Sequence, residues 1–338
     1  MCGIYGITDN DTAFIKKYLE LCSHRGPDGS NVWACDQVTL GHNLLGIMAD
    51  PTQSQQPWIT PKGNRLVYNG EIFNYNELLQ KYKNFNDTTG CDTELLAWGL
   101  DEYGMDFIEE IDSMHGFAYY DVASQKIILS RDHAGIKPLY YAQIDKGLVF
   151  ASEIKGMLDI VPNARTLDNL ACSMLTRAGT NPLRNTLFTN IKKVLPGETL
   201  TYDVKKKSLV LSKRIYIKPN ADQDYSKNDF KRMFADTVRR SAIGIRKIGV
   251  FLSGGLDSSI IAYELNKITE TVHSFTNRFA PEVGADEDYN SDSKIASKFA
   301  KEQKFNHHDV LVSPAEYLSA WNDSIYYMEQ PNYNPSNP

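Results

Sequence analysis

The sequence lacks the features of membrane, secreted and nucleic-acid-binding proteins. No apolar run in its 338 residues approaches the roughly 20 residues that cross a membrane. The first residues contain neither a basic segment nor an apolar core, so we expect no signal peptide. The net charge is −6, and the only basic run, Lys205-Lys206-Lys207, is typical of a solvated turn. Nucleic acid and membrane are therefore not expected as partners.

Cysteine is also scarce, and its spacing excludes two common kinds of site. The five cysteines form no CxxC pair and have no histidine at metal-ligand spacing. This pattern fits a reducing cytoplasm better than a disulfide framework or a zinc site. The five are Cys2, Cys22, Cys35, Cys91 and Cys172.

Cys2 is the most informative residue of the chain. Removal of Met1 would leave Cys2 with a thiol and a free α-amine, and an α-amine titrates near neutrality. Such a nucleophile carries its own general base, acting directly or through one water. The alternative for Cys2 alone is an ordinary small residue at the start of a strand, so the rest of the sequence must decide.

The length and the local patterns predict two domains. Residues 1–203 combine short strands, a hairpin over 116–121 and 125–130, and helices over 74–82 and from Asp92, which indicates an α+β layered domain. Residues 204–226 are polar and Lys-rich and are predicted to be a linker. Residues 227–338 predict an α/β doubly wound parallel sheet. Its expected strands are 248–252, 271–277 and 307–312, and its expected helices are 258–267, 290–303 and one after Pro314.

Ser253 to Ser259 (Ser-Gly-Gly-Leu-Asp-Ser-Ser) lies between a strand and a helix, where backbone N–H groups can converge on a phosphate. The Gly-Lys-Ser/Thr ending of the Walker loop is absent. Asp257 is a candidate to hold Mg²⁺ beside the phosphates. The alternative is a tight turn with a serine cap, although the two glycines, three serines and the aspartate exceed what a turn requires.

Together with Cys2, this loop makes the chain resemble the glutamine-hydrolysing asparagine synthetases, whose second domain belongs to the ATP pyrophosphatases. The resemblance covers nearly the whole chain. It implies an N-terminal-nucleophile αββα sandwich followed by an ATP-pyrophosphatase sheet. The matching segments are Met1-Cys2-Gly3-Ile4, His24-Arg25-Gly26-Pro27-Asp28, Asn69-Gly70-Glu71-Ile72-Phe73-Asn74, Thr89-Gly90-Cys91-Asp92-Thr93-Glu94, Arg131 to Tyr140 and Ala151-Ser152-Glu153-Ile154-Lys155.

The resemblance implies a role for each residue of a glutaminase site. Cys2 attacks the side-chain amide of glutamine, and Asn69 with the backbone of Gly70 stabilises the oxyanion. Asn-Gly alone is typical of a hairpin turn, which is the alternative at this position. Glu71 and Asp92 are expected to bind the α-amino group of glutamine. Asp92 also fits the first turn of a helix, and the two roles are compatible.

The remaining implied roles concern ATP and the supporting loops. Arg25 and Asp28 are expected to support the loop near Cys2, and Arg131, Asp132 and Lys137 to support the domain boundary and the ammonia route. A buried Arg–Asp pair that holds a loop is an equally good interpretation of Arg131 and Asp132. The ATP-binding residues implied are Leu252, Ser253, Gly254, Gly255, Asp257, Ser258, Ser259 and Asn277.

Two features depart from the family pattern. Leu44 stands where the family carries an Arg that binds the α-carboxylate of glutamine, so we expect weaker glutamine binding unless another cation replaces it. The α/β domain has about three strands and lacks a further acidic loop. We therefore expect a fragment or half of a split enzyme, completed by a second polypeptide, and a homodimer is also possible.

The expected function is ATP-driven amide synthesis, from glutamine and most simply aspartate, through β-aspartyl-AMP. One alternative is that the same fold acts on another carboxylate acceptor. The other is that the chain is a non-catalytic or partial subunit of a split synthetase.

Overall fold

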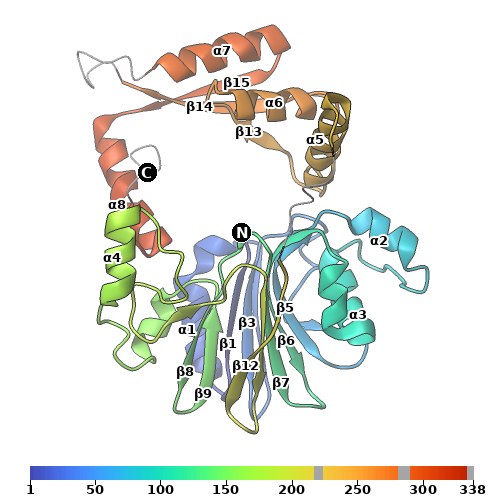
Figure 1. The fold of residues 1–338 in the computed structure, drawn as a ribbon, viewed down its shortest axis with the longest axis vertical. Coiled ribbons are helices and arrows are strands. Elements are labelled where there is room, and N and C mark those ends of the chain that lie inside the picture. Colours follow the sequence, from blue (N-terminus) through green and yellow to red (C-terminus); the bar gives the residue numbers. More distant parts are fainter. Residues whose placement is uncertain (217–223, 281–289, 333–338) are drawn as a thin grey trace. The chain divides into compact units, whose positions relative to one another are not determined.

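A computed structural model of the chain describes residues 1–216, 224–280 and 290–332. The chain forms two compact units, Met1–Pro219 and Asn220–Pro338. Each unit is described by itself below, and Figure 1 labels their elements. The division falls inside the segment that the sequence predicted to be a linker.

The first unit is built on two six-stranded sheets (Figure 1). In sheet order, the first contains β10 (Lys192–Lys193), β8 (Tyr140–Ile144), β9 (Gly147–Ala151), β1 (Gly3–Ile7), β3 (Thr39–Leu44) and β2 (Gly29–Ala34). The second contains β12 (Ser208–Arg214), β11 (Glu198–Asp203), β7 (Lys126–Arg131), β6 (Ser113–Asp121), β5 (Arg65–Ile72) and β4 (Trp58–Ile59). All strand pairs in both sheets are antiparallel.

Helices cover the outer faces of the two sheets. One cluster of buried residues joins α1 to the first sheet, and another joins α3 to the second sheet. A third cluster fills the space between the sheets, with Ile4 and Phe150 from one and Val67 and Leu129 from the other. This order of layers is the αββα sandwich that the resemblance implied. The helices are α1 (Thr12–Leu21), α2 (Tyr75–Lys81), α3 (Asp92–Tyr103) and α4 (Asn169–Ala178), with 3₁₀ turns η1 (Ser23–Arg25), η2 (Gly104–Glu109) and η3 (Lys155–Asp159).

The linker prediction is wrong for residues 208–214, which form β12 at the edge of the second sheet. Leu209 packs on the core between the sheets, whereas most of the strand is exposed. The strand contains the apolar run Leu209-Val210-Leu211, but the Lys-rich turn before it and Lys213-Arg214 after it favoured a linker. Val210 and Leu211 are each 55% exposed at this sheet edge. The Lys205–Lys207 turn connects β11 to β12, as expected of a solvated turn.

The second unit contains a three-stranded parallel sheet in the order β13-β14-β15. The strand–helix alternation predicted from the sequence is confirmed, and the three strands follow one another across the sheet. Ala262, Ala296 and Ala300 pack against Leu252 and Val272 in its core. The elements are α5 (Lys227–Ser241), β13 (Gly249–Phe251), α6 (Leu256–Leu265), β14 (His273–Phe279), α7 (Ser291–Gln303), β15 (Asn306–Val312) and α8 (Pro314–Met328).

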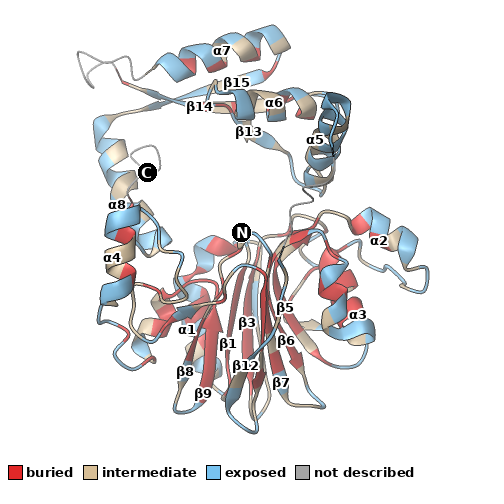
Figure 2. Ribbon diagram, viewed as in Figure 1, coloured by how far each residue is buried: buried red, intermediate tan, exposed pale blue. Residues whose placement is uncertain are grey.

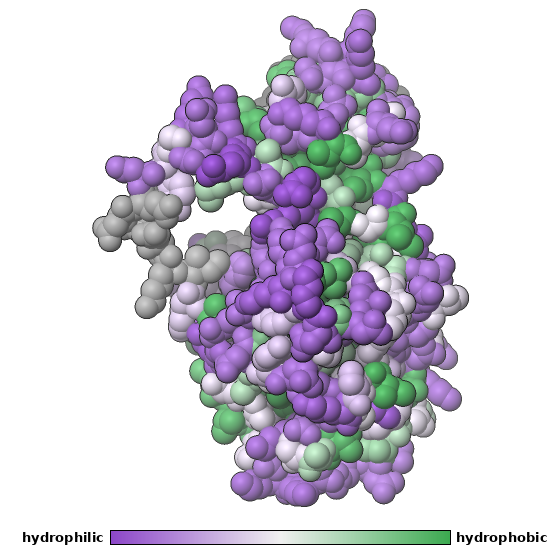
Figure 3. Space-filling model, turned by 90° about the vertical axis from the view of Figure 1, so that its right-hand side faces the viewer, coloured by the Kyte–Doolittle hydropathy of each residue, from purple (hydrophilic) through white to green (hydrophobic). Residues whose placement is uncertain are grey.

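Burial differs strongly between the two units (Figure 2). In the second unit, Phe251 is 86% exposed and Val310 and Leu311 are about half exposed. A parallel sheet of only three strands leaves these apolar side chains uncovered. The face drawn in Figure 3 is mainly hydrophilic, with scattered hydrophobic side chains. Among the described residues, no helix combines the length and the apolar character that a membrane span requires.

Candidate active site

Cys2 lies directly before β1 and is held through both its backbone and its thiol. The Arg25 side chain donates from Nε to the Cys2 carbonyl oxygen at 2.9 Å. Leu45 follows the neighbouring strand β3, and its N–H donates to Cys2 Sγ at 3.3 Å. The thiol is therefore fixed at the end of two adjacent strands, facing a pocket that other strand ends surround.

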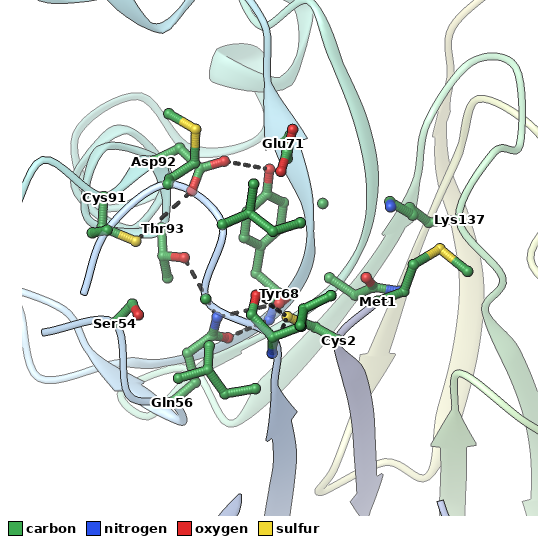
Figure 4. A pocket seen from close by; sticks show the side chains of 18 residues that line it. Met1, Cys2, Ser54, Gln56, Tyr68, Glu71, Cys91, Asp92, Thr93 and Lys137 are labelled. Carbon is green, nitrogen blue, oxygen red and sulfur yellow. Dashed lines mark hydrogen bonds between the residues drawn. The ribbon is translucent and has the colours of Figure 1, made fainter. Parts of the chain in front are cut away.

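Figure 4 shows this pocket, which brings together all the residues predicted for the glutaminase site. Cys2 lies on one side and Asp92 on another, with Glu71 and Lys137 bordering the space between them. The lining residues are Met1, Cys2, Leu44, Leu45, Gly46, Ile47, Met48, Ala49, Ser54, Gln56, Tyr68, Asn69, Gly70, Glu71, Cys91, Asp92, Thr93 and Lys137.

Asn69 and Gly70 lie inside β5 and not in a hairpin turn, so the turn alternative is wrong. Both residues pair with β6, Asn69 with Gly116 and Gly70 with His115. The Asn69 side chain is 1% exposed, and its Nδ2 has no hydrogen-bond partner among the described residues. A Cβ on Gly70 would lie 2.3 Å from the Met114 carbonyl oxygen, so only glycine fits. A buried donor without an acceptor is what a developing oxyanion needs.

The two carboxylates of the pocket differ in how they are satisfied. Asp92, the first residue of α3, accepts from Tyr68 Oη at 3.0 Å and from the Ile72 N–H at 3.1 Å. Glu71 Oε1 is buried and has no partner among the described residues. Burial raises the pKa of Glu71 to about 7 and that of Asp92 to about 6, and the Asp92 charge raises the Glu71 pKa further. Glu71 can thus bind an incoming cation, with Asp92 adding negative charge behind it.

Burial also raises the pKa of the Cys2 thiol, although the bond from Leu45 and the Lys137 charge oppose the shift. The thiol is therefore mainly protonated at neutral pH and needs a base to react. Burial lowers the pKa of the Met1 α-amine, which lies next to this thiol in the chain. Met1 lines the pocket, so its removal would place an amine on Cys2 itself.

The supporting residues hold loops, as the sequence partly predicted. Asp28 Oδ2 accepts from the Gly46 N–H at 2.9 Å, and Arg25 bonds Glu153 in addition to Cys2. Asp132 accepts from the backbone N–H groups of Ile136 and Lys137. The interpretation of Arg25 and Asp28 as loop supports agrees with these contacts.

The structure adds two residues to the site that sequence reasoning placed elsewhere or missed, Lys137 and Gln56. Lys137 was assigned to the domain boundary, but it lines the pocket and is 5% exposed. Gln56 accepts from the Tyr68 N–H at 2.6 Å and fixes the strand before Asn69. Leu44 also lines the pocket and is buried, so its apolar side chain faces the expected substrate. The Gln56 contact has no signal in the sequence, because it joins a side chain to the backbone of a residue 12 positions away.

The second unit holds a separate groove of about 830 Å³ at the ends of its parallel strands. Three of the predicted ATP-binding residues line it, namely Leu252, Ser253 and Asn277. Leu252 is 1% exposed, its N–H donates to the Phe275 carbonyl oxygen at 2.9 Å, and its carbonyl oxygen accepts from the Thr276 hydroxyl. The other lining residues are Phe251, Phe275, Thr276, Phe279, Asp292, Ser293, Ser313, Pro314, Tyr317 and Leu318.

The predicted phosphate loop borders this groove through Ser253. Gly254 has φ +77°, and a Cβ there would lie 2.7 Å from the Asp292 carbonyl oxygen. Ser253 Oγ and Ser258 Oγ are 3.0 Å apart, and Ser259 Oγ donates to the Gly255 carbonyl oxygen at 2.8 Å. The serine hydroxyls thus order a turn, and backbone N–H groups at the start of α6 lie beside it. The other five predicted residues do not line the groove, namely Gly254, Gly255, Asp257, Ser258 and Ser259.

Asp257 is exposed in the first turn of α6. Within the described part of the chain, no three histidine, cysteine or acidic side chains gather as a metal site. A single carboxylate fits a Mg²⁺ ion that is held mainly by substrate phosphates.

Sequence comparisons match each of the two units to a family. The glutamine amidotransferase domain family matches residues 1–216, and the asparagine synthase family matches residues 229–338. The chain belongs to the glutamine amidotransferase domain family. It is 29% identical to asparagine synthetase B [glutamine-hydrolyzing] of Escherichia coli (strain K12), over 97% of this chain and 57% of that protein.

Two further relatives carry the same printed activity. The chain is 29% identical to asparagine synthetase [glutamine-hydrolyzing] 2 of Bacillus subtilis (strain 168), over 92% of this chain and 44% of that one. It is 28% identical to asparagine synthetase [glutamine-hydrolyzing] of Mus musculus, over 97% and 59%. The chain spans about half the length of these curated relatives. Among solved structures, the glutamine phosphoribosylpyrophosphate amidotransferase of B. subtilis matches at TM-score 0.45 and 16% identity, over 93% of this chain and 91% of that chain.

Proposed function

We propose that the first unit hydrolyses glutamine at Cys2 and that the ammonia serves an ATP-driven amide synthesis. The observation that carries the proposal is one pocket lined by a fixed thiol, an unpartnered amide donor and an unpartnered carboxylate. These are Cys2 Sγ, Asn69 Nδ2 and Glu71 Oε1. Together they match the reacting carbonyl carbon, the carbonyl oxygen and the ammonium of glutamine.

The proposed reaction uses the thiol, the amide donor and the backbone beside them. After removal of Met1, the Cys2 α-amine takes the thiol proton, and sulfur attacks the side-chain carbonyl carbon. Asn69 donates to the oxygen that becomes negative, with the Gly70 N–H as the second donor. The proton passes to the leaving nitrogen, which departs as ammonia and leaves a thioester on Cys2. Water then cleaves the thioester and releases glutamate.

For the second unit, we propose ATP binding in the groove beside Ser253–Ser259. The exposed loop and the N-terminus of α6 would receive the phosphates, and Leu252 and Asn277, which line the groove, would lie beside the nucleoside. Mg²⁺, if bound, would be held by Asp257 together with the phosphates and would neutralise their charge. The favoured acceptor is aspartate, which gives β-aspartyl-AMP and then asparagine, AMP and pyrophosphate. The relatives' printed activities support this choice.

The partners and the compartment complete the proposal. The apolar side chains exposed on the short parallel sheet, Phe251 above all, favour a second polypeptide or a second copy that completes this unit. None of the five cysteines, all of which lie in the described residues, forms a disulfide. That state supports the proposed placement in the reducing cytoplasm.

The test supplies glutamine labelled with ¹⁵N in its amide, together with ATP, Mg²⁺ and aspartate. Labelled asparagine with equal amounts of AMP and pyrophosphate is expected. Pyrophosphate release with another carboxylate, but not with aspartate, would move the proposal to that acceptor. Glutamate without pyrophosphate would make this chain the glutaminase half of a split enzyme. Absence of glutamate would overturn the glutaminase and leave a non-catalytic subunit.

A further inference from the structure

An unpaired cation lies in the glutaminase pocket. Lys137 is 5% exposed and is the only cationic side chain among the described lining residues. Its Nζ has no hydrogen bond and no ion pair with any residue that the structure describes. Figure 4 shows the amine pointing into the space that Glu71 and Met1 also border. The Lys137 stem is buried, but Nζ keeps accessible surface, so the ammonium opens into the pocket. A fixed ammonium that opens into a pocket without an anion beside it points to a ligand that pairs with it.

The backbone of Lys137 is held from both sides, which fixes where its side chain starts. Its N–H donates to Asp132 Oδ2 at 3.0 Å, and its carbonyl oxygen accepts from Arg131 Nε at 2.6 Å. Arg131 also bonds the Gly135 and Val194 carbonyl oxygens. Because the loop fixes the backbone of Lys137, less conformational entropy is lost when its side chain binds a ligand.

Lys137 and Glu71 form a complementary pair of recognition groups. The charge of Lys137 lowers the pKa of Glu71, and the charge of Glu71 raises that of Lys137, yet the two described side chains form no ion pair within 4.0 Å. An α-amino acid carries its ammonium and its carboxylate on one carbon atom, so its two recognition groups must be neighbours. Inserting such a head group between Glu71 and Lys137 satisfies both charges at once. The wall beside them, which includes Leu44, Ile47 and Met48, is apolar and offers no alternative cation.

We propose that Lys137 binds the α-carboxylate of the amino-acid substrate, while Glu71 binds the ammonium on the same carbon. This assignment rests on the proposed glutaminase function. It makes Lys137 the cation that binds the α-carboxylate in place of the Arg that Leu44 replaces. Lys137 is thus a residue that determines specificity for free amino acids over amides and peptides.

The test measures binding to the full-length chain carrying Cys2→Ala, so that no turnover occurs. Titration calorimetry compares L-glutamine with L-glutamine α-amide, which keeps the ammonium and lacks the carboxylate. We expect glutamine to bind roughly 10- to 100-fold more tightly, the range of a charged hydrogen bond. Adding Lys137→Met should weaken glutamine to the level of the α-amide and leave the α-amide unchanged. Lys137→Arg should keep the preference, and exposed Lys192→Met is the matched control.

Two results overturn the assignment. The first is that the Cys2→Ala chain, with Lys137 intact, binds both ligands equally or binds neither of them. The other is an equal loss for both ligands in folded Lys137→Met, which would mean that the lysine acts on the pocket as a whole. Glutamate release by the unmutated chain is measured separately. If release is absent while the preference persists, the glutaminase function fails and the assignment of Lys137 stands.

Discussion

The two units place their functional residues in opposite environments. In the first unit, Asn69, Glu71 and Asp92 are almost fully buried around one pocket. In the second, Ser253, Gly255 and Asp257 are exposed beside an open groove. Figure 2 shows the same contrast in the strands, which are mainly buried in the first unit and mainly exposed or intermediate in the second. The candidate side chains of the first unit are thus enclosed, whereas those of the second unit are open to solvent.

The largest expected effect tests the enclosed unit at its nucleophile. Cys2→Ala should abolish glutamate release, with a fall of up to about 10⁶-fold in kcat because no other group can form the thioester. Cys172→Ser is the matched control, since Cys172 is partly exposed on α4 and far along the chain from the pocket lining. Residual activity close to the unmutated rate in Cys2→Ala would show that hydrolysis occurs elsewhere.

The next effect concerns the buried amide of Asn69. Asn69→Ala should lower kcat by about 10²- to 10³-fold and change KM little, because the donor is used only in the transition state. Steady-state glutamate release over a range of glutamine concentrations separates the two constants. Exposed Asn10→Ala should leave both unchanged. A rise in KM with constant kcat in Asn69→Ala would make this residue a ground-state binder.

In the open unit, the sharpest change is at Gly254. Its φ of +77° and its approach to the Asp292 carbonyl oxygen both exclude a side chain. Gly254→Ala should therefore cost about 1–3 kcal/mol of stability and should also weaken ATP binding. Gly179→Ala is the control, because Gly179 also has a positive φ but nothing lies within 4 Å of its Cβ position. Denaturant unfolding and nucleotide titration should show a larger loss at Gly254; equal losses would reduce its role to backbone strain.

A smaller effect concerns the pH dependence of stability. The folded pKa of Glu71 is about 7, above the ordinary value of 4.5, so the folded state binds the proton more tightly than the unfolded state. Stability from this group is thus full below pH 4.5 and is lost as the pH rises towards 7. Glu71→Gln should raise the Tm at pH 8 and change it little at pH 4.5, while glutamine binding is lost. An equal shift at both pH values would mean that burial of the charge is not the cause.

The sequence was sufficient for features that rest on local patterns. The strands before and after Ser253–Ser259, the hairpin of β6 and β7, and the helix beginning at Asp92 were all predicted and are present. Cys2, Asn69 and Asp92 meet in one pocket, as the resemblance implied. These predictions worked because each pattern determines its own backbone, and the resemblance supplied the pairing between distant segments.

Two features were missed, for different reasons. The strand β12 carries the apolar run Leu209-Val210-Leu211, a local strand signal, but the Lys-rich turn before it and Lys213-Arg214 after it favoured a linker. The position of Lys137 depends on backbone bonds to Asp132 and from Arg131, which decide where its side chain begins. The sequence pattern does not predict such bonds, so the sequence analysis places Lys137 at the domain boundary and not in the pocket.

The central claim is that Cys2 is a working N-terminal nucleophile in a glutamine-binding pocket. Intact mass of the purified chain, before and after treatment with 6-diazo-5-oxo-norleucine, tests it most directly. The account predicts loss of Met1 and one covalent adduct that maps to Cys2, with excess glutamine slowing the reaction. Retention of Met1, or the absence of an adduct on Cys2, would contradict the claim and leave the first unit without glutaminase chemistry.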